Sequence, residues 1–308
     1  MRCIPNILVL MAVYNGRLWV CEQIDSVLAQ EEVNLDLLIN DDHSSDGSLE
    51  LIQKKFGDFP NVKIQSSNIN SGSAGKNFYK LFLSANAFGY DYVALCDQDD
   101  IWLPNKLRCS IEILRGGRFG GYSSAVNVMH EGGSMRLMMQ SSKNMLGDFL
   151  FEGAGQGCTF VLPYSNFLKI KVFVLNNPAL IEYFHFHDWL IYILIRSWNY
   201  SWFFDSRPSM LYRQHLSNDI GARGGFQAAI KRLRLIKSGW YKNQLVIASS
   251  IYLEAGGSSE KIKVFIENLK KNNSFYRRIS MIKFIFCNGR RRIMDRFILM
   301  FSVAIGWL

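Results

Sequence analysis

The chain has 308 residues, 49% of them hydrophobic, and a formal net charge of +9. This is enough for one large domain, or for one domain with a substantial appendage, and it excludes an intrinsically disordered protein. The charge is uneven, because residues 223–308 contain 17 Lys and Arg against 4 Asp and Glu, whereas residues 1–222 are slightly acidic. The basic character therefore belongs to the C-terminal part.

The six cysteines occur singly, with no CxxC pair and no Cys/His cluster at the spacing of a zinc site. We therefore expect reduced thiols, as in an intracellular protein. The N-terminus leads directly into an apolar run at residues 7–13, which has the length of a strand and is followed by a turn. A cleavage site is missing there, so we expect no signal peptide.

Short apolar runs alternate with helical patterns through the first half of the chain. Strands are predicted at residues 7–13, 35–39, 62–64 and 92–96, and helices at 20–28, 49–56, 74–85 and 107–114. This order predicts βαβ units around an open, mostly parallel α/β sheet.

The middle of the chain is punctuated by glycines, which indicates loops and strands. A buried strand is predicted at 158–162 and a largely apolar helix at 188–198. From about residue 226 the pattern is helical, with a boundary expected at 221–225. We therefore predict a main α/β domain over residues 1–222 and a basic, amphipathic helical extension over residues 223–308.

Polar and acidic residues follow the predicted strands where each one ends. Tyr14-Asn15-Gly16 follows the first strand, Asp41-Asp42 the second, and residues 97–100 (DQDD) the fourth. Open α/β sheets place their ligand crevice at this edge. Three carboxylates in four residues repel one another, and Mg²⁺ or Mn²⁺ shared with phosphate oxygens is the usual remedy. The alternative is a set of exposed loop acids that cap helices, which Asp46 fits well.

Six strings make this interpretation more specific: VYNG at 13–16, NDDHSSDGS at 40–48, NSGSAGKN at 70–77, CDQDDIW at 96–102, FHDW at 186–189 and LYRQHLSND at 211–219. In order and spacing they resemble the motifs of family 2 inverting glycosyltransferases of the GT-A fold, and the last two resemble its bacterial rhamnosyltransferase-like branch. The resemblance covers about residues 5–222. It implies a sheet with a Rossmann-like nucleotide-binding half, flanked by helices.

The resemblance also implies a group of residues that bind the nucleotide sugar. Its members are Ala12, Val13, Tyr14, Asp42, Lys76, Asp97, Gln98 and Arg213. Ala12, Val13 and Tyr14 would line the nucleotide pocket, Asp42 would hydrogen-bond the base or ribose, and Asp97 would face the ribose. His43 departs from the family pattern, which usually has Gly or Asn there, and this leaves the local backbone conformation open.

The resemblance assigns Asp99 to a Mg²⁺ or Mn²⁺ ion that bridges the donor diphosphate. His215 would approach the diphosphate or complete the metal shell, although a purely structural histidine fits equally well. Cationic stabilisation of the leaving nucleoside diphosphate would come from this metal, helped by Lys76 or Arg213.

Inverting transfer needs one carboxylate that takes the proton of the acceptor hydroxyl, and the resemblance assigns this role to Asp188. The alternative is that Asp188 only caps the apolar helix that follows. His185 and His187 fit packing or loop positions better than ligand positions. Trp189 is predicted as a wall of the acceptor site, although most aromatic residues at such spacing belong to the core.

The C-terminal segment places Arg290-Arg291-Arg292 and Arg296 beside an apolar run at residues 297–308. A membrane-spanning helix needs about 20 apolar residues, so we expect an interfacial helix on an anionic membrane. This predicts a cytoplasmic protein, peripheral on the inner face of the membrane. A helix that packs on the main domain is an equal alternative.

Together these features predict transfer of a sugar, with dTDP-rhamnose as the suggested donor, to a lipid-linked saccharide in bacterial surface polysaccharide (O-antigen or capsule) synthesis. UDP-hexoses and UDP-N-acetylhexosamines are alternative donors on the same scaffold. A non-enzymatic alternative is a basic module that binds nucleic acid or membrane, and the apolar residues of the tail favour membrane, so no nucleic-acid partner is expected. A catalytically inactive sugar-nucleotide binder is a third hypothesis, against which Asp99 and Asp188 argue.

Overall fold

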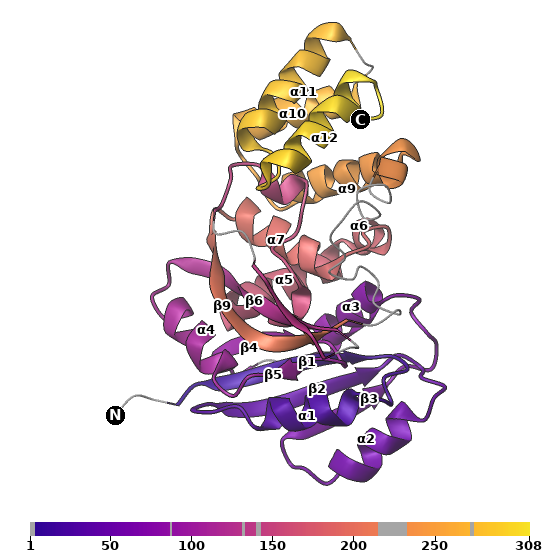
Figure 1. The fold of residues 1–308 in the computed structure, drawn as a ribbon, viewed down its shortest axis with the longest axis vertical. Coiled ribbons are helices and arrows are strands. Elements are labelled where there is room, and N and C mark those ends of the chain that lie inside the picture. Colours follow the sequence, from indigo (N-terminus) through magenta and orange to yellow (C-terminus); the bar gives the residue numbers. More distant parts are fainter. Residues whose placement is uncertain (1–3, 87, 131–132, 140–142, 215–232, 272–273) are drawn as a thin grey trace.

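The computed structural model describes residues 4–86, 88–130, 133–139, 143–214, 233–271 and 274–308 (Figure 1). The strands of these residues form one nine-stranded sheet in the order β3-β2-β1-β4-β8-β6-β9-β5, with β7 paired to β6. Helices flank the sheet, and C-terminal helices form a layer at one end of the molecule (Figure 1). The predicted α/β fold with a helical C-terminal region is confirmed.

The first half of the chain builds a parallel sheet, because each strand is followed by a helix that returns the chain to the same edge. The predicted βαβ order is confirmed. The elements are β1 (Asn6–Val13), α1 (Val20–Leu28), β2 (Asn34–Asp41), α2 (Ser48–Phe56), β3 (Val62–Ser66), α3 (Ala74–Ser84) and β4 (Tyr92–Cys96).

The register of these strands brings their carboxyl ends together. Val13 at the end of β1 pairs with Asp41 at the end of β2. On the other side of β1, Met11 pairs with Cys96 at the end of β4. The turns that follow the three strands therefore share one edge of the sheet, as expected for an open α/β ligand crevice.

Beyond β4 the sheet is mixed. Strand β8 is antiparallel to β4 and β6, β6 is parallel to β9, and β5 and β7 add antiparallel edges. The elements in this half are β5 (Ile101–Trp102), α4 (Lys106–Leu114), β6 (Phe119–Met129), β7 (Met135–Met138), the 3-10 helices η1 (Asp148–Leu150) and η2 (Gly157–Thr159), β8 (Val161–Pro163), α5 (Tyr164–Asn176), α6 (Pro178–Glu182), α7 (His187–Ser197) and β9 (Ser201–Arg213).

The strand predicted at 158–162 is shorter than expected and begins later. Residues Gly157–Thr159 form η2, and the backbone N–H and the hydroxyl of Thr159 both donate to the carbonyl of Gln156, at 3.0 and 2.8 Å. This local turn takes up hydrogen bonds that a strand would give to its neighbours. As a result, Cys158 is buried in a turn rather than in the sheet.

Alternating side chains of β1 build two apolar cores, one on each face of the sheet. Ile7, Val9, Met11 and Val13 pack with α1, α2 and α4, whereas Leu8, Leu10 and Ala12 belong to a larger cluster with α3, α5 and α7. The larger cluster continues into the C-terminal helices. One continuous core therefore joins the helix that carries Asp188 to the end of the chain.

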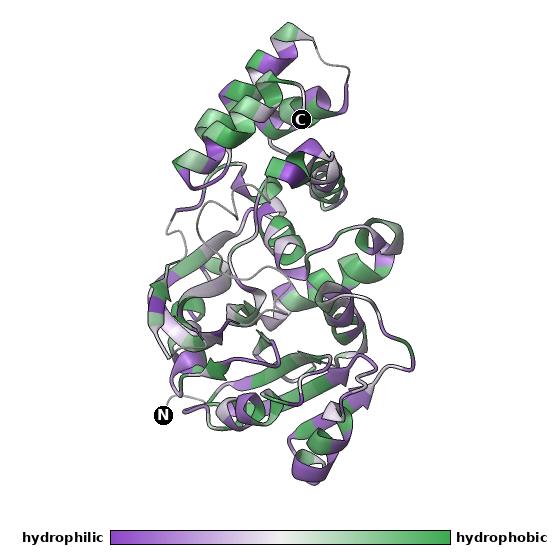
Figure 2. Ribbon diagram, turned by 45° about the vertical axis from the view of Figure 1, so that its right-hand side comes forward, coloured by the Kyte–Doolittle hydropathy of each residue, from purple (hydrophilic) through white to green (hydrophobic). Residues whose placement is uncertain are grey.

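The C-terminal layer consists of α9 (Trp240–Glu254), α10 (Glu260–Lys270), α11 (Phe275–Asn288) and α12 (Ile293–Ala304). Both apolar and polar residues occur along these helices (Figure 2). None of the helices that the structure describes is both long and apolar enough to span a bilayer. The domain boundary predicted at 221–225 lies outside the described residues.

Candidate active site

The turn after β1 is tied to the turn after β4 by a reciprocal pair of hydrogen bonds. The backbone N–H of Tyr14 donates to Gln98 Oε1 at 2.7 Å, and Gln98 Nε2 donates to the Tyr14 carbonyl at 2.9 Å. A Cβ on Gly16 would lie 2.4 Å from Gln98 Oε1, so a side chain at this position would displace the Gln98 amide. Gln98 was predicted to bind the nucleotide sugar, and the structure shows that its amide holds these two turns together.

The same turn is also held by the NDDHSSDGS segment. Asn15 N–H donates to Ser44 Oγ at 2.9 Å, Arg17 N–H donates to Asp46 Oδ2 at 3.0 Å, and Ser48 N–H donates to Asp46 Oδ1 at 3.0 Å. Asp46 thus supports the start of α2 from the position before the N-cap residue Gly47, and no side chain caps this helix. His43 adopts a left-handed backbone with φ +64°, which explains why Gly or Asn suits this position.

Asp42 is buried and fully engaged with the NSGSAGKN segment. Its carboxylate accepts from the Ser71 N–H at 2.9 Å and forms an ion pair with Lys80 Nζ at 2.9 Å. In this structure Asp42 therefore orders the loop that precedes α3. Ser71 and Lys80 were missed by the sequence analysis, although Lys80 follows Lys76 by one helical turn and its charge on that face was a usable signal.

Asn77 joins the carboxyl ends of β1 and β2. Its Nδ2 donates to the Val13 carbonyl at 3.1 Å, and its Oδ1 accepts from Asn40 Nδ2 at 2.6 Å. The side chains of Ala12 and Val13 are buried, so these two residues can offer a nucleotide only their backbone, whereas Tyr14 and Lys76 are exposed at the edge.

The DQDD turn combines one buried carboxylate with two partly exposed ones. Asp100 is fully buried, and its Oδ1 accepts from the Arg213 N–H at 3.1 Å. Burial, with the charges of Asp99 and Asp97 beside it, holds the pKa of Asp100 well above its ordinary value. Arg213 also donates to the Asp99 carbonyl at 3.0 Å and pairs with Glu22 at 2.6 Å. The predicted nucleotide-sugar residue Arg213 thus lies directly beside the DQDD turn.

The donor atoms at this turn suit a hard divalent cation. Asp97, Asp100 and Cys158 each offer an atom within 4.8 Å of the other two. Carboxylate oxygens are the ligands that Mg²⁺ and Mn²⁺ prefer, whereas a thiol suits softer metals. A cation here would offset the burial and the neighbouring negative charges that together raise the pKa of Asp100. The predicted ligand Asp99 is in the same turn but is not one of these three residues, and the other predicted ligand, His215, lies outside the described residues.

A buried lysine lies behind the carboxylates. Lys106 Nζ donates to the Thr159 carbonyl at 3.3 Å and lies 4.5 Å from the centre of the Trp102 ring. Burial lowers the pKa of Lys106 to about 8. The sequence analysis missed this residue, because a lysine in an amphipathic helix is normally exposed.

Asp188 is the second residue of α7 and is partly buried. Its Oδ1 accepts from the Trp189 N–H at 2.7 Å. Burial raises the pKa of Asp188 to about 6, against the lowering effect of backbone N–H groups. Phe186 occupies the N-cap position and no side chain caps the helix, so the capping alternative for Asp188 does not describe its geometry.

Asp188 lies close to both of the other parts of the site. A Cβ on Gly75, in the NSGSAGKN segment, would lie 2.5 Å from the His185 carbonyl, and a Cβ on Gly157 would lie 3.3 Å from Asp188 Cβ. Gly157 directly precedes Cys158, which shares the cluster with Asp97 and Asp100. Short chains of contacts therefore link the segment that carries the predicted base to the start of α3 and, through Cys158, to the DQDD turn.

The aromatic and histidine residues around Asp188 are packed. His187 is buried and its ring stacks on Phe78 at 4.0 Å, while His185 is an exposed loop residue, as expected for both. Trp189 is also buried, its Nε1 donates to the Phe149 carbonyl at 2.7 Å, and its ring stacks on Tyr241. Its indole is thus in the core, which corrects the expectation that it forms a wall facing an acceptor.

A parallel half-sheet that gathers polar turns and carboxylates at one edge is the arrangement expected of a glycosyltransferase of the GT-A fold. The chain belongs to glycosyl transferase family 2, whose family model matches residues 8–221.

The chain is also similar to two curated relatives. The chain is 35% identical over 269 residues to a dTDP-rhamnosyl transferase (RfbG) of Shigella flexneri, covering 87% of this chain and 93% of the relative. It is 26% identical over 188 residues to the UDP-Glc:alpha-D-GlcNAc-diphosphoundecaprenol beta-1,3-glucosyltransferase (WfgD) of Escherichia coli, covering 61% of this chain and 68% of the relative.

Solved structures confirm the fold. Residues 1–349 of S. aureus TarS in complex with UDP-GlcNAc align with a TM-score of 0.54 at 14% identity, covering 98% of this chain and 92% of that one. A mannosyltransferase from Pyrobaculum calidifontis in complex with GDP-Man and Mn²⁺ aligns with a TM-score of 0.53 at 12% identity, covering 100% and 82%.

Proposed function

We propose that this glycosyltransferase transfers rhamnose from dTDP-rhamnose to a lipid-linked saccharide during assembly of a bacterial surface polysaccharide. The donor is supported by the Shigella flexneri relative, which matches nearly the whole chain. The lipid-linked acceptor is supported by the Escherichia coli relative, which is named for a diphosphoundecaprenol-linked sugar. The structural observation that carries the proposal is the packing of Gly157 against Asp188 next to the Asp97, Asp100 and Cys158 cluster.

Asp188 acts as the general base in this proposal. With a pKa of about 6 it is ionised at neutral pH and still basic enough to accept a proton. The acceptor hydroxyl attacks the anomeric carbon, its proton passes to the Asp188 carboxylate, and the bond from that carbon to the nucleoside diphosphate breaks on the opposite face. The Trp189 N–H orients the carboxylate through its bond to Oδ1.

Asp99, in the same turn as Asp97 and Asp100, would hold the Mg²⁺ or Mn²⁺ ion, which would supply positive charge to the leaving diphosphate when it is bound. The other residues of the DQDD turn hold it in place. Asp100 anchors the turn to β9 through the Arg213 N–H, and Gln98 anchors it to Tyr14. Lys76, exposed in the first turn of α3, is available for the donor phosphates.

The C-terminal helices would dock the enzyme on the cytoplasmic face of an anionic membrane. Large apolar side chains of α11 and α12 are exposed, among them Phe286, Ile293, Met294, Phe297, Phe301 and, just beyond α12, Ile305. They lie in a strongly basic part of the chain, and this combination suits an anionic bilayer surface better than nucleic acid.

A thermal-shift panel of nucleotide sugars, with Mn²⁺ and with chelator, tests the donor directly. Any ligand that binds only the folded protein raises the melting temperature. The proposal expects the largest metal-dependent rise with dTDP-rhamnose. A larger rise with a UDP-hexose or UDP-N-acetylhexosamine would assign the alternative donor, and no rise with any of them would contradict nucleotide-sugar binding.

A further inference from the structure

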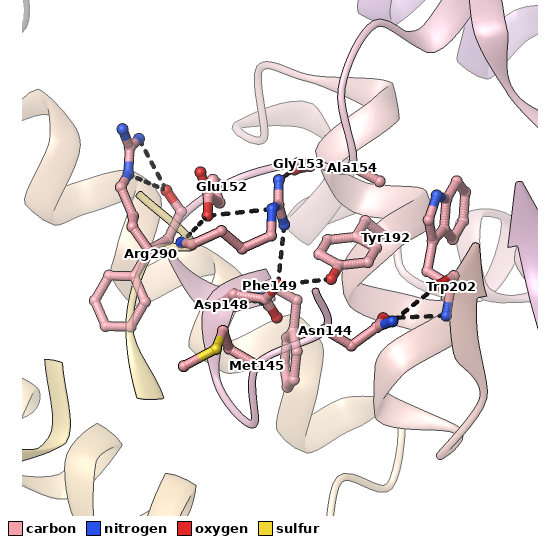
Figure 3. Close-up of polar contacts among 12 residues, drawn as sticks. Asn144, Met145, Asp148, Phe149, Glu152, Gly153, Ala154, Tyr192, Trp202 and Arg290 are labelled. Carbon is pink, nitrogen blue, oxygen red and sulfur yellow. Dashed lines mark hydrogen bonds and ion pairs between the residues drawn. The ribbon is translucent and has the colours of Figure 1, made fainter. Parts of the chain in front are cut away.

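Two of the three consecutive arginines after α11 are held inside the protein. The Arg291 side chain is 7% exposed and that of Arg290 is 20% exposed, whereas Arg292 is an exposed residue. The charge triplet was expected to face a membrane. Its first two members instead contact the segment 148–153, which begins with η1 and leads toward η2 (Figure 3).

Arg291 is bonded along this segment. Its Nη1 pairs with Asp148 Oδ2 at 3.0 Å, its Nη2 donates to the Gly153 carbonyl, and its own N–H donates to Glu152 Oε1 at 2.6 Å. Asp148 is fully buried. Arginine suits this position, because its planar fork can satisfy a carboxylate and a carbonyl at once.

Arg290 holds the middle of the same segment. Its Nε and Nη2 donate to the Phe151 carbonyl at 3.2 and 3.1 Å, and Tyr241 Oη donates to the same carbonyl at 2.7 Å. Asp295, in the first turn of α12, pairs with Arg290 at 3.3 Å. The junction between α11 and α12 therefore holds one side of residues 148–153 through these contacts.

The other side of the segment packs on α7. Tyr192 Oη donates to Asp148 Oδ2 at 2.8 Å (Figure 3). Arg196 pairs with Asp148 Oδ1 at 3.2 Å. The Phe149 carbonyl accepts from Trp189 Nε1, and a Cβ on Gly153 would lie 3.4 Å from Trp189 Cα. The two Trp189 contacts hold α7 next to Asp188, whereas Tyr192 and Arg196 hold the middle and the C-terminal end of the same helix.

We infer that Arg291, with Arg290, is a positioning residue for the base Asp188, acting through residues 148–153 and α7. The inference rests on the proposed role of Asp188. The C-terminal layer is thus a required part of the active site, since it fixes the orientation of α7 against η2. Displacement of a catalytic group by about 1 Å can cost about 100-fold in rate.

The test compares Arg291→Met and Arg291→Lys with Arg292→Met, a matched change at the exposed neighbour. Release of dTDP from dTDP-rhamnose is measured with a GlcNAc-diphosphate-polyprenol acceptor. Arg291→Met should lower kcat by about 10- to 100-fold with the KM for donor within twofold, Arg291→Lys should recover part of the loss, and Arg292→Met should match wild type. A folded Arg291→Met with kcat within twofold of wild type would overturn the inference.

Hydrogen exchange gives a readout that does not depend on the donor. Arg291→Met should speed exchange across residues 187–190 at least about tenfold and leave β1 to β4 unchanged, since opening would be local. Equal exchange there in variant and wild type would overturn the inference. If Arg291→Met does not fold, Arg291→Lys and Glu152→Gln replace it and are compared with Arg292→Met in the same assays. Asp188→Asn is measured in parallel. If this variant keeps full activity, Asp188 is not the base, and the exchange result then reports only whether Arg291 stabilises the start of α7.

Discussion

Gly157 packs against Asp188 so closely that a side chain has no room between them. A Cβ on Gly157 would lie 3.3 Å from Asp188 Cβ and 2.6 Å from His187 Nε2. His187 is buried and stacked on Phe78, so it cannot move aside easily. The contact joins η2, which carries Cys158 of the carboxylate cluster, to the helix that presents the base.

Gly157→Ala should therefore disturb the site from a position that touches no substrate. We expect kcat to fall by about tenfold or more, because Asp188 must shift, together with a loss of about 1–3 kcal/mol in stability from overpacking. Gly116→Ala is the control, since the nearest atom to a Cβ there is the Ile113 carbonyl oxygen at 4.0 Å. Steady-state kinetics and urea unfolding check both, and equal kcat in the two variants would show that the contact has no role.

Asp99→Asn should abolish the metal dependence of nucleotide binding, because an amide is a much poorer ligand for Mg²⁺ or Mn²⁺ than a carboxylate. Calorimetric titration of dTDP with and without Mn²⁺ measures this. Asp58→Asn, at an exposed loop position, controls for the loss of one negative charge. Metal-dependent affinity that is the same in Asp99→Asn and wild type would remove Asp99 from the metal site.

Lys80 and Lys76 lie one turn apart on α3 and should behave differently. Lys80→Ala leaves the buried Asp42 carboxylate without its ion pair and should cost about 1–3 kcal/mol of stability. Lys76→Ala changes an exposed side chain and should stay within about 0.5 kcal/mol of wild type. If Lys76 contacts the donor phosphates, only its variant weakens dTDP binding at unchanged stability. Urea unfolding and dTDP titration of both variants measure this. Weaker dTDP binding in Lys80→Ala together with lower stability in Lys76→Ala would contradict these assignments.

Membrane docking is best tested at the exposed face of α12. Phe297 and Phe301 are 49% and 58% exposed, so changing both to Glu should leave the fold intact and release the protein from anionic vesicles. Deleting residues 281–308 is not a clean test, because it also removes Arg290 and Arg291, which bond to residues 148–153. Flotation with phosphatidylglycerol vesicles at low salt measures binding. If the wild-type protein stays unbound there, the face is not a membrane contact.

The sequence was sufficient to predict the elements from β1 to β4, the helix α4 and the edge where the turns meet, but not the short strand β5. Alternating apolar residues and the polar strings after Val13, Asp41 and Cys96 carry that information locally. Contacts between distant segments were not predictable in this way. The bonds between Gln98 and Tyr14, and between Arg291 and Asp148, join residues far apart in the chain and leave no periodic signal.

Two features reversed a reasonable sequence expectation. Consecutive arginines beside an apolar run usually mark a solvated or membrane-facing surface, yet Arg290 and Arg291 face backbone carbonyls and buried acids. Trp189 stands beside the predicted base, yet its ring faces the core. In both cases tertiary packing decides the orientation of the side chain, and it cannot be read from neighbouring residues.

The pH dependence of turnover follows from the burial of Asp188. Because its folded pKa is raised to about 6, the base is lost as the pH falls through that value, so kcat should decline with unit slope below about pH 6. The folded state binds more protons than the unfolded chain below this pH, and so the stability contribution of Asp188 falls as the pH rises toward about 6. Asp188→Asn should therefore melt at or above the wild-type temperature near neutral pH.

Turnover of Asp188→Asn is the most direct test of the account. The amide nearly preserves the size of the side chain but cannot take the acceptor proton, so kcat should drop by about 10²- to 10⁴-fold while dTDP affinity and melting temperature stay at wild-type level or higher. A kcat within a few-fold of wild type in that folded, nucleotide-binding variant would contradict the assignment of Asp188 as the catalytic base.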